Sequence, residues 1–166
     1  MRAPPWTRRA AAAALAAGLA LAAPAQAEHW ELQKNWNYDK LAFIHDLPFA
    51  EKNVVLQVSQ GDPARWELAL NNASNLLEYW GQGKVRIVLV AYGPGLKMLL
   101  ADSPVAKRIQ GLDAEDVEFD ACHQTMLGMQ RKTGKLPVLV PQAAVVPGGL
   151  VRLMQLQEAH FDYVKP

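Results

Sequence analysis

The chain has 166 residues, of which 51% are hydrophobic and 20% are charged, and its 17 Lys and Arg nearly balance its 16 Asp and Glu. This length suits one ordinary domain, and the apolar fraction is too high for a disordered protein. A net charge of +1 argues against a protein that coats nucleic acid by charge, and no nucleic-acid partner is expected.

The first 27 residues have the pattern of a cleavable signal peptide. Three arginines among the first nine residues precede an apolar stretch over 10–23, which Pro24 ends, and Ala25-Gln26-Ala27 supplies the small residues of a cleavage site. The stretch is shorter than the roughly 20 residues that span a bilayer. We predict cleavage near Ala27 and a periplasmic or secreted protein that has no membrane attachment afterwards. Ordinary secretion is favoured over twin-arginine export, which the sequence leaves open.

Residues 28–52 combine aromatic and polar side chains without a lasting period of 2 or 3.6. We interpret them as an N-terminal extension that packs on the domain, in which Trp30 and Trp36 are candidates for a subunit contact. The domain itself is predicted over 53–166.

The domain begins with an alternation of strands and helices. Residues 53–59 predict a first strand, and Asp62-Pro63 is a helix start signal for residues 63–80. Apolar side chains, including Trp66 and Trp80, recur there at helical spacing and predict a core-facing stripe. Residues 85–92 form an apolar run typical of a strand that is buried on both faces.

The alternation continues to the end of the chain. We expect a short helical stretch from Leu96 and then a helix that starts at Ser103-Pro104. Strands are expected over 117–121 and 143–146, followed by a helix after Gly149 and an edge strand at 163–164. Repeated strand–helix–strand units favour parallel pairing with right-handed crossovers. The predicted fold class is therefore α/β, with helices on both faces of a mainly parallel sheet of about five strands.

Cys122 is the single cysteine of the chain, so it cannot form an internal disulfide. It is predicted where a strand ends and a helix begins, where unpaired backbone N–H groups and the helix macrodipole favour a thiolate. We expect a partly accessible, reactive thiol, with His123 as a helper that bears positive charge beside it. The alternative is a small buried hydrophobe, the common fate of a free cysteine.

The sequence gives little support for a metal site, a cofactor site or acid–base catalysis. The remaining histidines have no metal-ligand spacing, and the glycine loops at 81–83 and 93–95 match neither a dinucleotide fingerprint nor a phosphate loop, so neither a metal nor a cofactor is expected. Four acidic residues around a strand start, Asp113, Glu115, Asp116 and Glu118, are interpreted as a solvated loop.

Four segments together resemble the DsrE/DsrF-like sulfur-relay proteins, in their exported single-domain branch. They are Asp62–Trp66 with the helix that follows, Val90–Leu96, Ala121–Met126, and Val145–Gly149 with Leu153–Glu158. The resemblance implies a three-layer, flavodoxin-like (DsrE-like) fold, homo-oligomers, and a cysteine at Cys122 that holds sulfur as a persulfide. His160 departs from the pattern, because the family commonly has glycine in that turn.

The resemblance and the residues lead to one functional hypothesis and two alternatives. The first is a periplasmic sulfur carrier, possessing sulfurtransferase-like activity, whose partners are a protein thiol or a small sulfane-sulfur compound. A non-catalytic oligomeric binding module and a thiol redox sensor remain alternatives, and both would use the same residue differently.

Overall fold

The computed structural model describes residues 41–166, so the predicted signal peptide and both Trp30 and Trp36 lie outside the described residues. The elements are β1 (Lys52–Val58), α2 (Pro63–Trp80), β2 (Val85–Ala91), the 3-10 helix η1 (Gly93–Leu99), α3 (Ala106–Asp113), β3 (Glu118–Cys122), α4 (His123–Thr133), β4 (Ala143–Val146), α5 (Gly149–Glu158) and β5 (Asp162–Val164).

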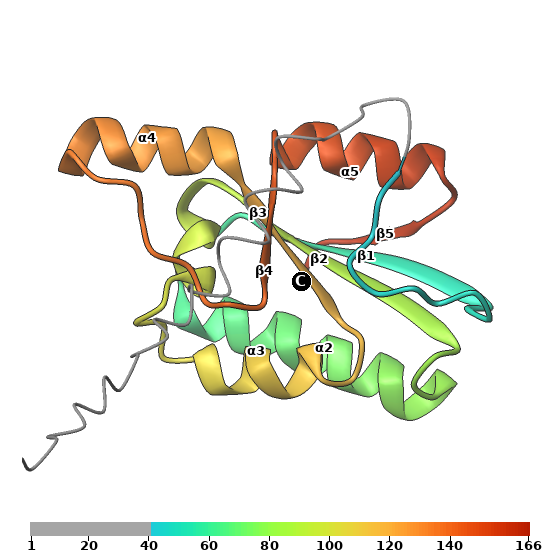
Figure 1. Cartoon of the computed structure of the whole chain (residues 1–166). Helices are drawn as coiled ribbons and strands as arrows, with labels where there is room; N and C mark the ends of the chain where they lie inside the picture. The colour runs from blue at the N-terminus through green and yellow to red at the C-terminus, as the bar shows by residue number, and fades with distance from the viewer. Residues whose placement is uncertain (1–40) are drawn as a thin grey trace, which may run out of the picture.

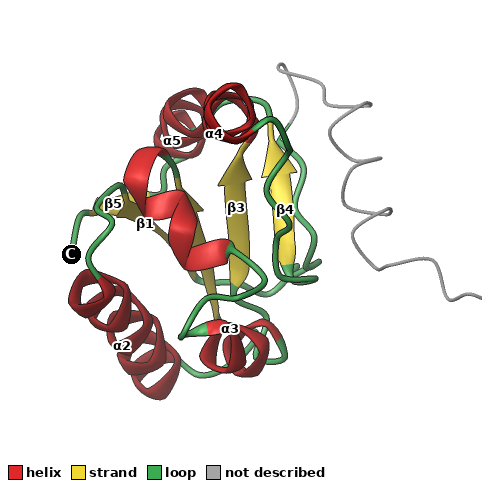
Figure 2. Ribbon diagram, turned by 90° about the vertical axis from the view of Figure 1, so that its left-hand side faces the viewer, coloured by secondary structure: helices red, strands yellow, loops and turns green. Residues whose placement is uncertain are grey.

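The strands form one sheet in the order β4-β3-β2-β1-β5, and every neighbouring pair is parallel. Figure 1 shows α4 and α5 on one side of this sheet and α2 and α3 on the other, and the turned view in Figure 2 agrees. The predicted three-layer α/β class with about five strands is confirmed. Parallel strands need covered faces, which explains the nearly unbroken apolar runs of β1 and β2.

Helix α2 starts as the sequence predicts. Asp62 is its N-cap, since the carboxylate accepts a hydrogen bond from the backbone N–H of Ala64 at 3.0 Å, and Pro63 occupies the first helical position. Trp66 is buried in the core, but Trp80 is 38% exposed, so the prediction that both face the core is wrong for Trp80. Trp80 is the last residue of α2, so this end of the apolar face of the helix lies at the edge of the core.

The segment between β2 and β3 differs in detail from the prediction. The stretch after Tyr92 is a 3-10 helix that begins at Gly93 rather than near Leu96. Helix α3 begins at Ala106, three residues after Ser103, whose hydroxyl instead accepts a bond from the Val105 N–H at 3.4 Å. The Ser-Pro signal therefore marks a turn that precedes the helix.

Residues 41–51 pack across the sheet on the side that carries α5. The ring of Phe43 stacks on Phe161 with a centroid separation of 5.8 Å, and the Arg86 guanidinium lies 4.2 Å from the centroid of Phe43. Arg86 also donates to the carbonyls of His45 and Leu47 at 2.8 and 3.1 Å. This part of the chain thus contributes to the core of the α/β domain.

The turn between α5 and β5 contains His160, whose φ of 63° lies in the left-handed region that favours glycine. The turn where the resembling family commonly has glycine therefore has a glycine-like backbone conformation in this chain. Histidine adopts this conformation with less strain than a β-branched residue.

Candidate functional site

The parallel register brings three polar side chains into one row at the carboxyl end of the sheet. Val58 pairs with Ala91, and Ala91 pairs with Ala121, so the residues that follow them, Ser59, Tyr92 and Cys122, lie side by side. Carboxyl ends of parallel strands are the common location of functional groups in such sheets. The sequence-predicted site residue Cys122 therefore lies at the edge where we expect chemistry.

Cys122 is the last residue of β3 and the N-cap of α4, as the sequence predicts. The N-cap side chain makes no hydrogen bond with the first N–H groups of α4, and the thiol belongs to this positive end of the helix. The thiol is free but only 5% exposed. The expectation of a partly accessible thiol is therefore wrong for the single chain.

Tyr92 connects the row to a polar network. Its hydroxyl accepts a hydrogen bond from the Gln57 amide at 2.5 Å, and the same amide donates to Ser59 at 3.2 Å. The hydroxyl of Tyr163 donates to the Gln57 side-chain carbonyl. Burial and the neighbouring Tyr163 raise the pKa of Tyr92, and negative charge on Cys122 raises it further. Tyr92 therefore stays a neutral phenol beside the thiol at neutral pH.

Helix α5 closes over Tyr92 through a glycine. A Cβ atom at Gly149 would lie 2.8 Å from the Cβ of Tyr92, which is closer than side chains tolerate. The turn Pro147-Gly148-Gly149 thus lets the start of α5 approach the row that contains Cys122. This turn is one of the segments on which the sequence resemblance rests.

His123 is the second predicted site residue and follows Cys122 at the start of α4. Partial burial lowers the pKa of His123 below its ordinary value of 6.5. The imidazole is accordingly neutral at pH 7. It does not supply the positive charge that the sequence-based hypothesis assigned to it.

A buried ion cluster lies behind Cys122 on the same face of β3. Alternate strand residues share a face, so Glu118 and Asp120 point to the same side as Cys122. The Arg152 guanidinium of α5 donates to Asp120 at 2.7 Å and to Glu118 at 2.9 Å, and these side chains are at most 4% exposed. Glu118 also accepts from the Ile44 N–H at 2.9 Å.

The cluster carries two carboxylates against one guanidinium. Burial first, and then the charge of Asp120, raise the pKa of Glu118 to about 8, although Arg152 and the Ile44 N–H act in the opposite direction. The interpretation of Glu118 as part of a solvated loop is therefore wrong. Sequence reasoning missed the cluster, although the alternation of Glu118, Asp120 and Cys122 in a predicted strand was a usable signal.

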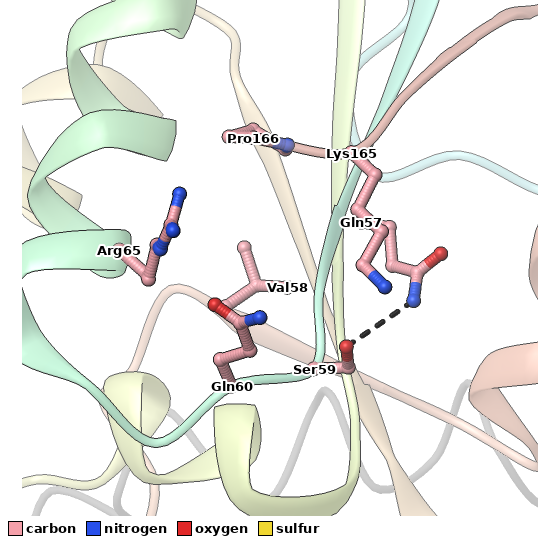
Figure 3. Close-up of a pocket in the computed structure, with 7 residues that line it drawn as sticks. All are labelled: Gln57, Val58, Ser59, Gln60, Arg65, Lys165 and Pro166. Carbon is pink, nitrogen blue, oxygen red and sulfur yellow. Dashed lines mark hydrogen bonds between the residues drawn. The ribbon is translucent and has the colours of Figure 1, made fainter.

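Two hollows lie near the carboxyl edge. The one in Figure 3 is lined by Gln57, Ser59, Arg65 and others, but its volume of about 10 Å³ holds no more than a water molecule. The second is an open groove of about 670 Å³ between η1 and α4. Only the second has the volume of a typical small-molecule site.

Within residues 41–166, no group of three or more His, Cys, Asp or Glu side chains has the arrangement of a metal site. The helices of this same range are too short or too polar to cross a membrane. The chemistry that the described site offers is that of a single thiol with a neutral phenol beside it.

The arrangement is similar to two solved structures. The protein of unknown function MTH1491 from Methanobacterium thermoautotrophicum is 28% identical, with a TM-score of 0.62, over 70% of this chain and 100% of its own. The ychN protein from E. coli is 21% identical, with a TM-score of 0.50, over 69% of this chain and 98% of its own. No protein-family model and no curated protein matches. The chain has the three-layer, flavodoxin-like (DsrE-like) α/β fold.

Proposed function

We propose that this protein is an exported, single-domain member of the DsrE/DsrF-like group and acts as a single-cysteine sulfur carrier. The observation that carries the proposal is the place of Cys122, which ends β3 and begins α4 at the carboxyl edge of the sheet. The N–H groups of a helix start stabilise negative charge on a nearby sulfur. The same residue lies within one of the segments that resemble the sulfur-relay proteins.

The reaction needs one nucleophile and no redox partner. The Cys122 thiolate attacks the outer sulfur of a sulfane donor R–S–SH, the S–S bond of the donor breaks, and its electron pair leaves with R–S⁻. Cys122 becomes a persulfide that retains the proton of the outer sulfur. An acceptor thiolate then attacks that outer sulfur, and Cys122 leaves as a thiolate.

The neutral Tyr92 suits this reaction. A neutral phenol beside the thiol adds no negative charge to the site, whereas a phenolate would repel a sulfur anion. Tyr92 lies next to Cys122 in the row, and Gln57 fixes its hydroxyl. We assign Tyr92 the role of a positioning residue beside the persulfide.

The burial of Cys122 favours a second candidate function. A thiol that is 5% exposed reacts only when covering side chains move, and a packed cysteine in a binding module would look the same. In that alternative the protein is a non-catalytic, oligomeric interaction module.

The intact mass of the protein after incubation with polysulfide decides between them. A carrier gains one sulfur atom per chain, and a reductant removes it because a persulfide is a reducible S–S bond. Cys122→Ser abolishes the gain while the protein stays folded, since serine is close in size and suits an N-cap. If the masses of wild type and of Cys122→Ser are both unchanged by every donor, while the wild-type thiol is still alkylated, the carrier function falls and the binding module remains.

The remaining parts of the proposal concern where the protein acts and with what. The signal-like residues 1–27 support export to the periplasm or beyond. One thiol per chain requires a partner, either a protein thiol or a small sulfane-sulfur compound. Homo-oligomers are part of the proposal because the resemblance implies them.

A further inference from the structure

The groove between η1 and α4 has a positively charged rim and an apolar floor. Lys97 of η1 and Arg131 and Lys132 of α4 contribute the charge, and Pro94 and Met129 are among the apolar lining residues. No carboxylate lines it. Within residues 41–166, these three cations form no ion pair with Asp or Glu.

The charges of both walls have a local explanation, because Lys97 lies in the last turn of η1 as Arg131 and Lys132 do in α4. Basic residues in the last turn of a helix stabilise its macrodipole, which accounts for Arg131 and Lys132. Lys97 comes from a different element and adds positive charge on the opposite wall. Three unpaired cations around one hollow favour an anionic ligand.

Gly128 lines the groove on the α4 side. A Cβ atom at Gly128 would lie 3.6 Å from the terminal Nη2 of Arg131, so the guanidinium lies over the position that a side chain would fill. The φ angle of Gly128 is not positive, so the backbone conformation does not require glycine there. Glycine nevertheless makes the helix less stable than alanine would. A side chain longer than one methyl group would instead extend toward the guanidinium and into the groove.

The groove reaches the neighbourhood of the thiol. Thr125 and Gly93 both line it, and the Thr125 hydroxyl accepts a hydrogen bond from the Gly93 N–H at 2.9 Å. Thr125 is one turn of α4 from the N-cap Cys122, and Gly93 follows Tyr92 in the chain. Cys122 does not itself line the groove, so transfer from a ligand seated there requires the side chains that cover the thiol to move.

We propose that this groove binds a low-molecular-weight organic persulfide whose body carries at least two carboxylates, as the sulfur donor for Cys122. This inference rests on the proposed sulfur-carrier function, from which the persulfide class of the ligand follows. The volume of about 670 Å³ exceeds what an inorganic sulfur anion needs and suits a molecule of short-peptide size. The Cys122 thiolate takes the outer sulfur, the donor S–S bond breaks, and the donor leaves as its thiolate, still held by the cations.

Binding is tested separately from sulfur transfer with S-methylglutathione, an unreactive thioether with two carboxylates, titrated into the protein by calorimetry at low salt. Lys97→Gln with Arg131→Gln weakens binding by about tenfold, since two charge pairs are lost. The matched control Lys107→Gln with Lys165→Gln makes the same change of net charge away from the groove and leaves binding unchanged. The dimethyl ester of the probe, which lacks both negative charges, binds about tenfold more weakly than the probe itself.

A steric pair of variants adds a second line of evidence. Gly128→Leu fills the groove and abolishes binding, whereas Gly128→Ala keeps it, because a single methyl group makes only ordinary contact with Arg131. Thermal unfolding confirms that each variant is folded.

The outcomes separate the two proposals. Undetectable binding of the probe, or equal weakening by the control pair, overturns the groove assignment. Tighter binding of an acidic decapeptide than of the probe also overturns it and assigns the groove to a protein partner. Specific probe binding without any sulfur gain on Cys122 from any donor overturns the carrier function and leaves the anion groove standing.

Discussion

Arg152 shows how one residue determines the stability of the sheet face behind the candidate site. It donates to two buried acidic side chains, Glu118 and Asp120, and also to the Ala42 carbonyl at 2.9 Å. Taking such charges out of water is costly, and only mutual pairing offsets the cost. Removing this cation takes away the buried partner of both acidic side chains.

We expect Arg152→Met to lower the free energy of unfolding by about 3–5 kcal/mol, measured by urea denaturation. Arg108→Met is the control, because it breaks the half-exposed pair with Glu67 and should cost no more than about 1 kcal/mol. Arg152→Lys keeps the charge and should recover part of the loss. Similar small losses for Met at both positions would contradict a structural role of the cluster.

Glu118 gives the protein a pH dependence of defined sign. Its pKa is raised to about 8 in the folded protein, from 4.5 in a solvated chain, so the folded state holds a proton that the unfolded state releases. This contribution to stability is complete below about pH 4.5 and is lost as the pH rises toward 8. Its slope is at most about 1.4 kcal/mol per pH unit.

Glu118→Gln, which cannot ionise, removes this contribution. Urea unfolding between pH 5 and 8 should therefore show a flatter fall of stability for the variant than for wild type. The control Glu115→Gln changes an exposed acid nearby and should leave the slope unchanged. Parallel curves for wild type and Glu118→Gln would show that Glu118 titrates normally.

Among the elements, η1 depends on close contact between two backbones. A Cβ atom at Gly95 would overlap the carbonyl oxygen of Val58, the last residue of β1. This contact brings η1 against the carboxyl edge, where it forms one wall of the groove. Neither helix propensity nor hydrophobic period requires glycine here.

We predict that Gly95→Ala destabilises the protein by about 1–3 kcal/mol, since overpacking against a fixed backbone forces η1 to shift. Gly111→Ala in α3 is the matched control, because a Cβ there meets nothing within 4 Å and alanine favours the helix by about 0.4–1 kcal/mol. Both are measured by denaturation. A neutral Gly95→Ala would mean that η1 is free to move without cost.

For the whole molecule, the outer face of α5 leaves apolar side chains uncovered. Leu150, Val151 and Met154 are 63%, 44% and 55% exposed and belong to the helix whose first residue, Gly149, closes over Tyr92. Clustered exposed apolar residues are typical of interfaces. This face is where we expect a second copy of the chain to contribute to the proposed oligomer.

Light scattering at micromolar concentration should therefore give a mass above that of one chain. Leu150→Glu with Met154→Glu should shift it to the monomer, because buried charge without a partner opposes association. The control Tyr79→Glu, on the exposed side of α2, should leave the mass unchanged. A wild-type monomer would contradict the oligomer, and an unshifted double variant would place the interface elsewhere.

Sequence alone determined the order of the elements, the parallel α/β class and the position of Cys122 between β3 and α4. These follow from short-range signals: apolar runs, helical spacing, and caps such as Asp62. Local signals did not predict that Trp80 is partly exposed or that α3 begins three residues after Ser103. Burial and helix starts near the end of an element depend on the residues that pack there.

Tertiary structure alone decided the environment of the thiol. The row of Ser59, Tyr92 and Cys122 depends on strand register, and the pairing of Arg152 with Asp120 joins residues 32 positions apart. Glu118 meets Ile44 across 74 positions. Periodicity predicts which side of a strand a residue faces, but it does not predict which residues pack against that side. The burial of Cys122, the buried charges and the groove therefore depend on the tertiary structure.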